Sequence, residues 1–179
     1  MVKKKECNFL VNEMEKVFNF IQKRVANISQ PKKAVWIYRL QPLGIGCKGT
    51  LVEDIFKKLN IINVGELINP NCKTILEISI EHLIKYNPDI IFLWGFTKAK
   101  PKDILNNSQW KLIKAVKEGK VYKVPKNLGT WSPSLAILSL WIAMKVYPEK
   151  FKDVNFIKYS NSFYQKIFGV PYSKVVLDE

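Results

Sequence analysis

The sequence predicts an α/β fold in which a central, mainly parallel sheet lies between two layers of helices. Three observations support this prediction: apolar runs without alternation at 90–94 and 121–124, helical periodicity before each run, and tight turns between helix and strand. Apolar runs without alternation are typical of strands that are buried on both faces. Helix–strand units that repeat along the chain favour a Rossmann-like, three-layer α/β/α domain.

The composition is that of a folded domain. A chain of 179 residues can form one sizeable core but is short for two. Its 47% hydrophobic and 12% aromatic content excludes a disordered chain. The longest apolar run, 135–144, is broken by Ser139 and is shorter than the roughly 20 residues of a membrane span. The basic start at Met1 lacks the apolar stretch of a signal peptide, so we expect either a cytoplasmic protein or a fragment of an exported one.

The formal net charge of +14 suggests an anionic partner. Nucleic acid or an anionic membrane is one alternative. However, the lysines are scattered apart from Lys3 to Lys5, and the only arginines are Arg24 and Arg39. Arginine is the better reader of bases and phosphates, so we expect no nucleic-acid partner. A small anionic ligand is the other alternative.

No residue pattern predicts catalysis. Cys7, Cys47 and Cys72 are widely spaced and form no CxxC pair, so we expect three free, mostly buried thiols and no zinc site. The single histidine, His82, is expected to face solvent on a helix. Since neither a nucleophile with its base nor a metal cluster is recognisable, the sequence favours binding without a cofactor over enzymatic turnover.

The first element is an amphipathic helix over residues 9–28, which Pro31 ends. Its apolar side chains recur at helical spacing: Leu10, Met14, Val17, Phe18, Ile21, Val25 and Ile28. We assign residues 1–32 to this long helix and residues 33–179 to the α/β domain.

A strand follows at 34–40. Its side chains alternate, so Val35, Ile37 and Arg39 are expected on one face and Trp36 and Tyr38 on the other.

A loop rich in Gly and Pro, residues 41–50, comes after this strand. A phosphate-binding loop is an alternative for it, but the spacing fits neither the Walker pattern nor GxGxxG. We expect the loop to line a ligand cleft, because open α/β sheets bind ligands beyond the carboxyl ends of their strands.

Three helices and two strands are expected next. Thr50 and Glu53 fit a capping box at the start of a helix whose buried face includes Phe56. Residues 61–64 form a short strand or turn. A helix over 77–86 is ended by Pro88, and the strand 89–94 follows. A helix over 110–117 ends near Gly119, before the strand 121–124.

Two further helices complete the prediction. Ser132 and Pro133 fit the N-cap and first position of a buried helix over 135–146. A last helix over 154–168 stops at Gly169, and the tail has a strand-like stretch at 175–177.

Candidate binding residues follow the ends of the predicted strands. Tyr38 and Arg39 end the first strand, and Gln41 comes directly after it; Trp94 and Phe96 follow the next, and Trp131 lies in the loop 127–134. Aromatic side chains cover flat apolar ligands at low entropic cost. Trp94 and Trp131 are alternatively core residues. Arg39 either clamps a ligand carboxylate or phosphate or pairs with a carboxylate on the domain surface.

Three stretches resemble successive blocks of one family: SIEHLIKYNPDIIFL, SQWKLIKAVKEGKVYKVP and WSPSLAILSLWIAMKVYPEKF. They are similar to the C-terminal lobe of the ABC-transporter solute-binding proteins of class III, which carry iron-siderophores, haem or cobalamin. The resemblance extends over most of residues 34–151. It implies two Rossmann-like lobes joined by a long helix, with the ligand between them, and here the first lobe is missing.

The resemblance also implies a function. The ligand would be a metal chelate, either a ferric siderophore, haem or cobalamin, contacted at the positions of Tyr38, Arg39, Gln41, Trp94, Phe96 and Trp131. Glu53 would dock the lobe onto an ABC permease, and the location would be extracytoplasmic. A lone lobe should bind weakly, and two chains could pair through the exposed half-cleft. The rival hypotheses are a cytoplasmic Rossmann-like nucleotide-binding module and a basic nucleic-acid-binding module.

Overall fold

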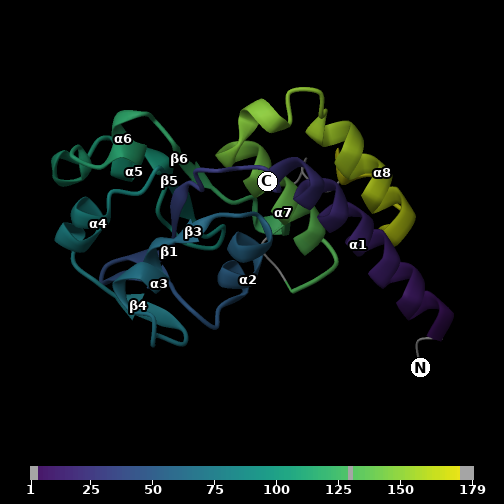
Figure 1. Ribbon diagram of the computed structural model, residues 1–179, viewed down its shortest axis with the longest axis horizontal. Helices are drawn as coiled ribbons and strands as arrows, with labels where there is room; N and C mark the ends of the chain where they lie inside the picture. The colour runs from purple at the N-terminus through teal and green to yellow at the C-terminus, as the bar shows by residue number, and fades with distance from the viewer. Residues whose placement is uncertain (1–3, 129–130, 174–179) are drawn as a thin grey trace. The chain divides into compact units, whose positions relative to one another are not determined.

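The computed structural model describes residues 4–128 and 131–173 (Figure 1). They form two compact units: a helical unit made of Met1–Asn27 with Asn127–Glu179, and a sheet unit, Ile28–Lys126. The change of unit after Asn27 lies near the boundary expected at residue 32. The C-terminal residues, however, group with the first helix rather than with the sheet.

The sheet unit contains the predicted mainly parallel sheet. β1 (Lys33–Leu40) lies at its centre and pairs in parallel with β5 (Ile90–Leu93) and with the short β3 (Ile62–Asn63). β6 (Val121–Lys123) extends the parallel part from β5, whereas β2 (Leu43–Gly46) and β4 (Ile75–Glu77) add two antiparallel pairings. The order is β4-β2-β1-β5-β6, which confirms an α/β sheet that is parallel around its centre.

β2 is a difference from the prediction, because residues 41–50 were expected to be a loop. Leu43 and Ile45 alternate with Gly44 and Gly46, and all four are buried. The strand returns along β1 through a hairpin whose Gln41–Pro42 peptide is cis. The two glycines hide the strand pattern in the sequence, since glycine disfavours strands. Because these glycines are packed inside a sheet, they do not form a phosphate loop.

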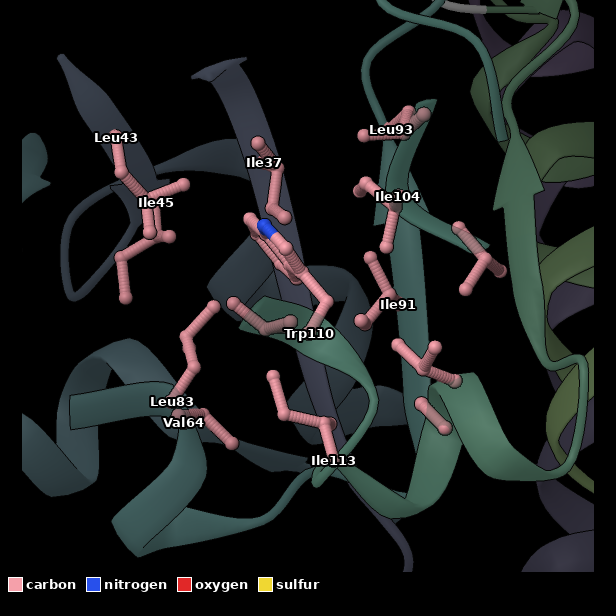
Figure 2. Packing of buried hydrophobic residues seen from close by; sticks show 14 residues of the cluster. Ile37, Leu43, Ile45, Val64, Leu83, Ile91, Leu93, Ile104, Trp110 and Ile113 are labelled. Carbon is pink, nitrogen blue, oxygen red and sulfur yellow. The ribbon is translucent and has the colours of Figure 1, made fainter. Parts of the chain in front are cut away.

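Helices cover both faces of this sheet. α3 (Val64–Ile68), α4 (Ile80–Tyr86), α5 (Pro101–Leu105), η1 (Ser108–Trp110) and α6 (Lys114–Lys117) contribute to a core with one face of β1, β2 and β5. Figure 2 shows the Trp110 side chain reaching from η1 toward the sheet in this core. α2 (Leu51–Lys58) packs on the opposite face, where the Phe56 and Phe92 rings are 6.2 Å apart.

Several helix ends differ from those predicted. The stretch 77–86 divides into β4 and α4, and the stretch 110–117 divides into η1 and α6. Asn87 ends α4 in the left-handed conformation, and Gly119 has the positive φ expected of it. Thr50 is the N-cap of α2, but the capping box does not form: its hydroxyl donates to the Cys47 carbonyl, and Glu53 accepts from Gly49 instead.

The helical unit is built around α1 (Lys4–Val25), which packs against α7 (Leu135–Val146). η2 (Lys126–Leu128), η3 (Pro148–Lys150) and α8 (Phe156–Phe168) are its other helices (Figure 1). The N-cap of α7 is Ser134 rather than Ser132, so the proline precedes the helix instead of starting it. Gly169 ends α8 as predicted, whereas the strand expected at 175–177 lies outside the described residues.

Arg24 fastens the last turn of α1 within this unit. Its guanidinium donates two hydrogen bonds of 2.7 Å to the Asp153 carboxylate and one of 2.7 Å to the Lys150 carbonyl. The same group lies 4.5 Å from the centre of the Phe20 ring. None of the described helices is both long and apolar enough to span a membrane.

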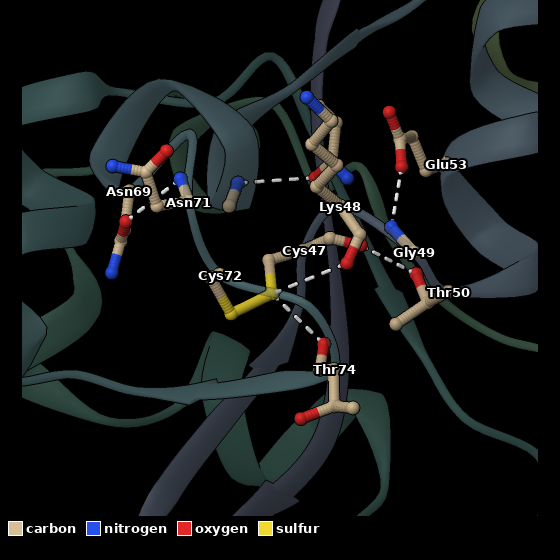
Figure 3. Close-up of a disulfide and its surroundings, with 11 residues drawn as sticks. Cys47, Lys48, Gly49, Thr50, Glu53, Asn69, Asn71, Cys72 and Thr74 are labelled. Carbon is tan, nitrogen blue, oxygen red and sulfur yellow. Dashed lines mark hydrogen bonds between the residues drawn. A yellow bond between two sulfur atoms is a disulfide. The ribbon is translucent and has the colours of Figure 1, made fainter.

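The cysteines correct the expectation of three free thiols. Cys47 and Cys72 form a disulfide, and Cys7 is free and exposed (Figure 3). Their 25-residue separation carries no motif, and only the pairing of β2 with β4 brings them together.

Asp89 connects three segments at the amino-terminal ends of the parallel strands. Its carboxylate accepts hydrogen bonds of 2.8 Å from the Lys33 backbone N–H and 2.7 Å from the Lys114 ammonium. Burial alone would raise the pKa of Asp89, but these hydrogen bonds outweigh it and lower the pKa. Asp89 therefore ties the starts of β1 and α6 to the turn before β5.

We expect Asp89→Asn to lower the free energy of unfolding by about 1 to 2 kcal/mol near neutral pH, because it removes hydrogen bonds to a charged acceptor. A lowered folded-state pKa stabilises the fold above the pKa of the unfolded carboxyl, and this contribution is lost as the pH falls through the folded-state pKa. Urea unfolding of both proteins should therefore give curves that converge in strong acid. Exposed Glu149→Gln is the control; equal stability of wild type and Asp89→Asn at pH 7 would contradict the account.

Candidate ligand-binding surface

Three of the predicted residues form an aromatic row at one edge of the sheet unit. The Tyr38 and Trp94 rings meet edge to face with their centres 5.6 Å apart, and the Trp94 and Phe96 rings are 5.2 Å apart. Tyr38 and Trp94 are half-buried, whereas 47% of Phe96 is exposed. The row therefore presents a partly open aromatic surface.

The strand register places this row at the carboxyl ends of β1 and β5. Ile37 is opposite Leu93, the last residue of β5, and the Trp94 N–H donates to the Ile37 carbonyl at 2.8 Å. The β1–β2 register shifts between Ile37 and Arg39, so Tyr38 lies at a bulge. Bulges re-aim side chains and are frequent beside functional sites.

Close backbone packing holds the loop that carries Phe96. A methyl group in place of the Gly95 hydrogen would lie 2.6 Å from the Val124 carbonyl oxygen, so only glycine fits here. The Lys123 ammonium donates to the Thr97 carbonyl at 2.8 Å. These contacts fix the loop after β5 against the segment after β6.

The edge beside the aromatic row is positively charged. Lys98, Lys100 and Lys102 are exposed, and no acidic residue occurs between 94 and 102. Asp103 follows, and its carboxylate accepts the Lys100 backbone N–H at 2.8 Å. Burial raises the pKa of Tyr38, so its phenol is neutral at physiological pH and can donate a hydrogen bond.

Arg39 and Gln41 have separate positions on the hairpin. Arg39 pairs with the Glu77 carboxylate on β4, and its Nε donates to the Pro42 carbonyl at 3.3 Å. Of its two alternatives, the surface ion pair is therefore the one that the structure contains. Gln41 is exposed at the hairpin turn.

Trp131 belongs to the helical unit, where 84% of its surface is exposed. The expectation that it shares a rim with Trp94 stays a prediction. An indole with this much exposed surface is not a core residue.

Glu53 is only 4% exposed and is engaged within its own helix start. Its carboxylate pairs with Lys57 and accepts the Gly49 N–H at 2.6 Å (Figure 3). Burial works to raise the pKa of Glu53, but these two hydrogen bonds outweigh it and lower the pKa. This geometry disfavours Glu53 as a docking residue.

Two supporting residues were missed by sequence reasoning. Gly46 underlies the Tyr38 ring, and Gly95 allows the two strand-end loops to touch. The period-two alternation of 43–46 is the signal that would have found Gly46. In the part of the chain that the structure describes, no three His, Cys, Asp or Glu side chains group as metal ligands, and His82 is exposed as expected.

Comparisons with known proteins agree with this architecture. A family model described as periplasmic binding protein matches residues 3–128. The molybdate-binding protein MolA of Haemophilus influenzae is 31% identical over 100 residues, which are 54% of this chain and 28% of MolA.

Solved structures show the same fold. CeuE of Helicobacter pylori, as a nickel–histidine complex, is 32% identical with a TM-score of 0.80 over 93% of this chain and 53% of that chain. Molybdate-bound MolA is 24% identical with a TM-score of 0.77, over 92% of this chain and 51% of that one. The chain thus spans about half the length of these structures. The family match covers most of its residues, so the chain belongs to the periplasmic binding protein family.

Proposed function

We propose that this chain is the C-terminal lobe of the solute-binding component of an ABC importer for metal chelates of the iron-siderophore, haem or cobalamin type. The observation that carries the proposal is the aromatic row Tyr38–Trp94–Phe96 at the carboxyl ends of β1 and β5. Ligands of open α/β sheets bind at this edge. The function is binding and delivery, without turnover of the ligand.

The chemistry of the edge supports an organic chelate over a bare ion. Aromatic faces stack on the conjugated surface of a catecholate, porphyrin or corrin. Exposed lysines next to them favour a ligand that also carries negative charge. A naked oxyanion such as molybdate would instead need converging N–H donors, and stacked rings supply none.

The relatives differ in what they bind, and this sets the range of the proposal. CeuE is described with nickel and histidine, and MolA with molybdate. Both are small metal species, and the nickel–histidine complex is itself a chelate with organic ligands. We infer the same general class for this chain.

Half of a cleft should bind its ligand weakly, because two lobes that close bury most of a ligand's surface. The second half would come from a first lobe, in keeping with the length of the relatives; the pairing of two chains through this face is the alternative. An extracytoplasmic location is part of the proposal, and the Cys47–Cys72 disulfide supports it, since disulfides persist in oxidising compartments.

Docking onto an ABC permease also belongs to the proposal. Since the Glu53 carboxylate is buried, the exposed Asp54 beside it on α2 is the better placed acidic group for a basic partner surface.

The first test is calorimetric titration of the two-lobed protein with ferric catecholate, ferric hydroxamate, haem, cobalamin and molybdate. We expect one chelate to bind. Trp94→Ala and Trp131→Ala should each weaken it by about 2 kcal/mol, or roughly thirtyfold, as for central aromatic contacts, while leaving the fold intact. Leu112→Ala, also exposed, is the control. Unchanged affinity in both tryptophan variants, or binding of molybdate alone, would contradict the proposal.

The charge of the edge can be tested separately. Lys98, Lys100 and Lys102 changed together to Gln should weaken an anionic chelate about tenfold, a modest effect for each exposed charge, and should flatten its salt dependence. The control changes three exposed lysines elsewhere: Lys111, Lys117 and Lys152. Equal losses in the two triple variants would mean that only net charge matters.

A further inference from the structure

The Cys47–Cys72 disulfide lies where the β2–β4 ladder ends. The last paired residues are Gly46 and Ile75, and Cys47 directly follows Gly46. The Cys47 N–H donates to the Thr74 carbonyl at 3.2 Å, and its sulfur lies 2.9 Å from the same oxygen (Figure 3). The disulfide therefore adds a covalent rung to this ladder.

β4 needs such a rung because it is an edge strand of only three residues. None of its residues is buried, and 39% of Ile75 is exposed. A short edge strand with little buried apolar surface opens easily. Without the disulfide, three paired positions hold β4 to β2.

Gly46 connects this rung to the aromatic row. A methyl group in place of its hydrogen would lie 3.2 Å from Cε2 of Tyr38, so the ring rests directly on the Gly46 backbone. On another side α3 closes in, because a methyl group on Gly65 would lie 2.2 Å from the Gly46 carbonyl oxygen. Gly46 has almost no room to move unless Tyr38 moves with it.

The chain after Cys47 is equally confined. Gly49 has a φ of +78°, and a methyl group there would lie 2.6 Å from the Lys73 carbonyl oxygen, next to Cys72. The segment before β4 is thus held against the segment after β2 both by the disulfide and by packing.

We propose that the Cys47–Cys72 disulfide positions Tyr38 against Trp94, so that its redox state sets the affinity of the aromatic row. The consequence for affinity rests on the proposed function, whereas the positioning does not. Cys47 and Cys72 act through Gly46 and are positioning residues that do not touch the ligand.

The redox step is a thiol–disulfide exchange with a dithiol reductant. Two electrons and two protons pass to the protein, the S–S bond breaks, two thiols form, and the reductant closes to its own disulfide. Dithiothreitol supplies this chemistry in the test. A Cys7→Ser background leaves this disulfide pair as the only thiols that change.

The test is fluorine NMR of the chain labelled with 5-fluorotryptophan, which gives one resonance for each of five tryptophans. Tryptophan-to-phenylalanine variants assign them. On reduction we expect the Trp94 resonance to shift while Trp110, in the core on the other face of the sheet, does not. Titration with a ferric catecholate should show affinity lowered about fivefold or more, as for coupled sites.

Two variants separate positioning from stability. Gly46→Ala should shift Trp94 in the oxidised protein by pushing the Tyr38 ring, with the disulfide intact. Leu83→Ala, which is fully buried in the other core, should destabilise the fold without shifting Trp94.

An unmoved Trp94 resonance after reduction would overturn the proposal, and so would a reduced protein in which Trp110 shifts equally, because the disulfide would then be a general stabiliser. If Trp94 shifts but the chelate binds neither form, the positioning stands and the proposed function fails.

Discussion

The pleat of β1 determines both the core and the binding surface of the sheet unit. This strand pairs with β2, β3 and β5, and its alternate residues face opposite ways. Val35 and Ile37 enter the core shared with β2, β5 and several helices. Trp36 and Tyr38 belong to the aromatic side, where Trp36 lies 6.2 Å from Phe92 and Tyr38 lies 5.6 Å from Trp94. One strand therefore joins stability and ligand contact.

Glycines transmit this arrangement to the neighbouring loops. Gly46 lets β2 pass beneath the Tyr38 ring, and Gly95 lets the Phe96 loop touch the segment after β6. At both places a single methyl group would meet its neighbour at 3.2 Å or less. The binding surface is therefore preorganised by backbone packing, which lowers the entropic cost of holding a ligand.

The sequence was sufficient for elements with strong local signals. β5 and β6 are unbroken apolar runs, and Gly119 and Gly169 take the positive φ that their positions require. β2 was missed because two of its four residues are glycine. The disulfide was missed because its partners meet only through strand pairing. Glu53 fits the capping-box spacing, yet it bonds Gly49, because side-chain partners depend on loop geometry. The contact of Tyr38 with Trp94 and Phe96 follows from the strand-end rule, whereas the placement of Trp131 beside them stays a prediction.

The most direct measurement is a pair of NMR titrations of the isotope-labelled chain, one with a ferric catecholate and one with its gallium analogue. High-spin iron(III) broadens signals of nearby nuclei, and diamagnetic gallium provides the reference. The account predicts that broadening centres on Tyr38, Trp94 and Phe96, with smaller effects at Lys98 and Lys100. Broadening centred elsewhere in the sheet unit, or spread evenly over the exposed lysines, would contradict the claim that the aromatic row is the ligand-binding surface.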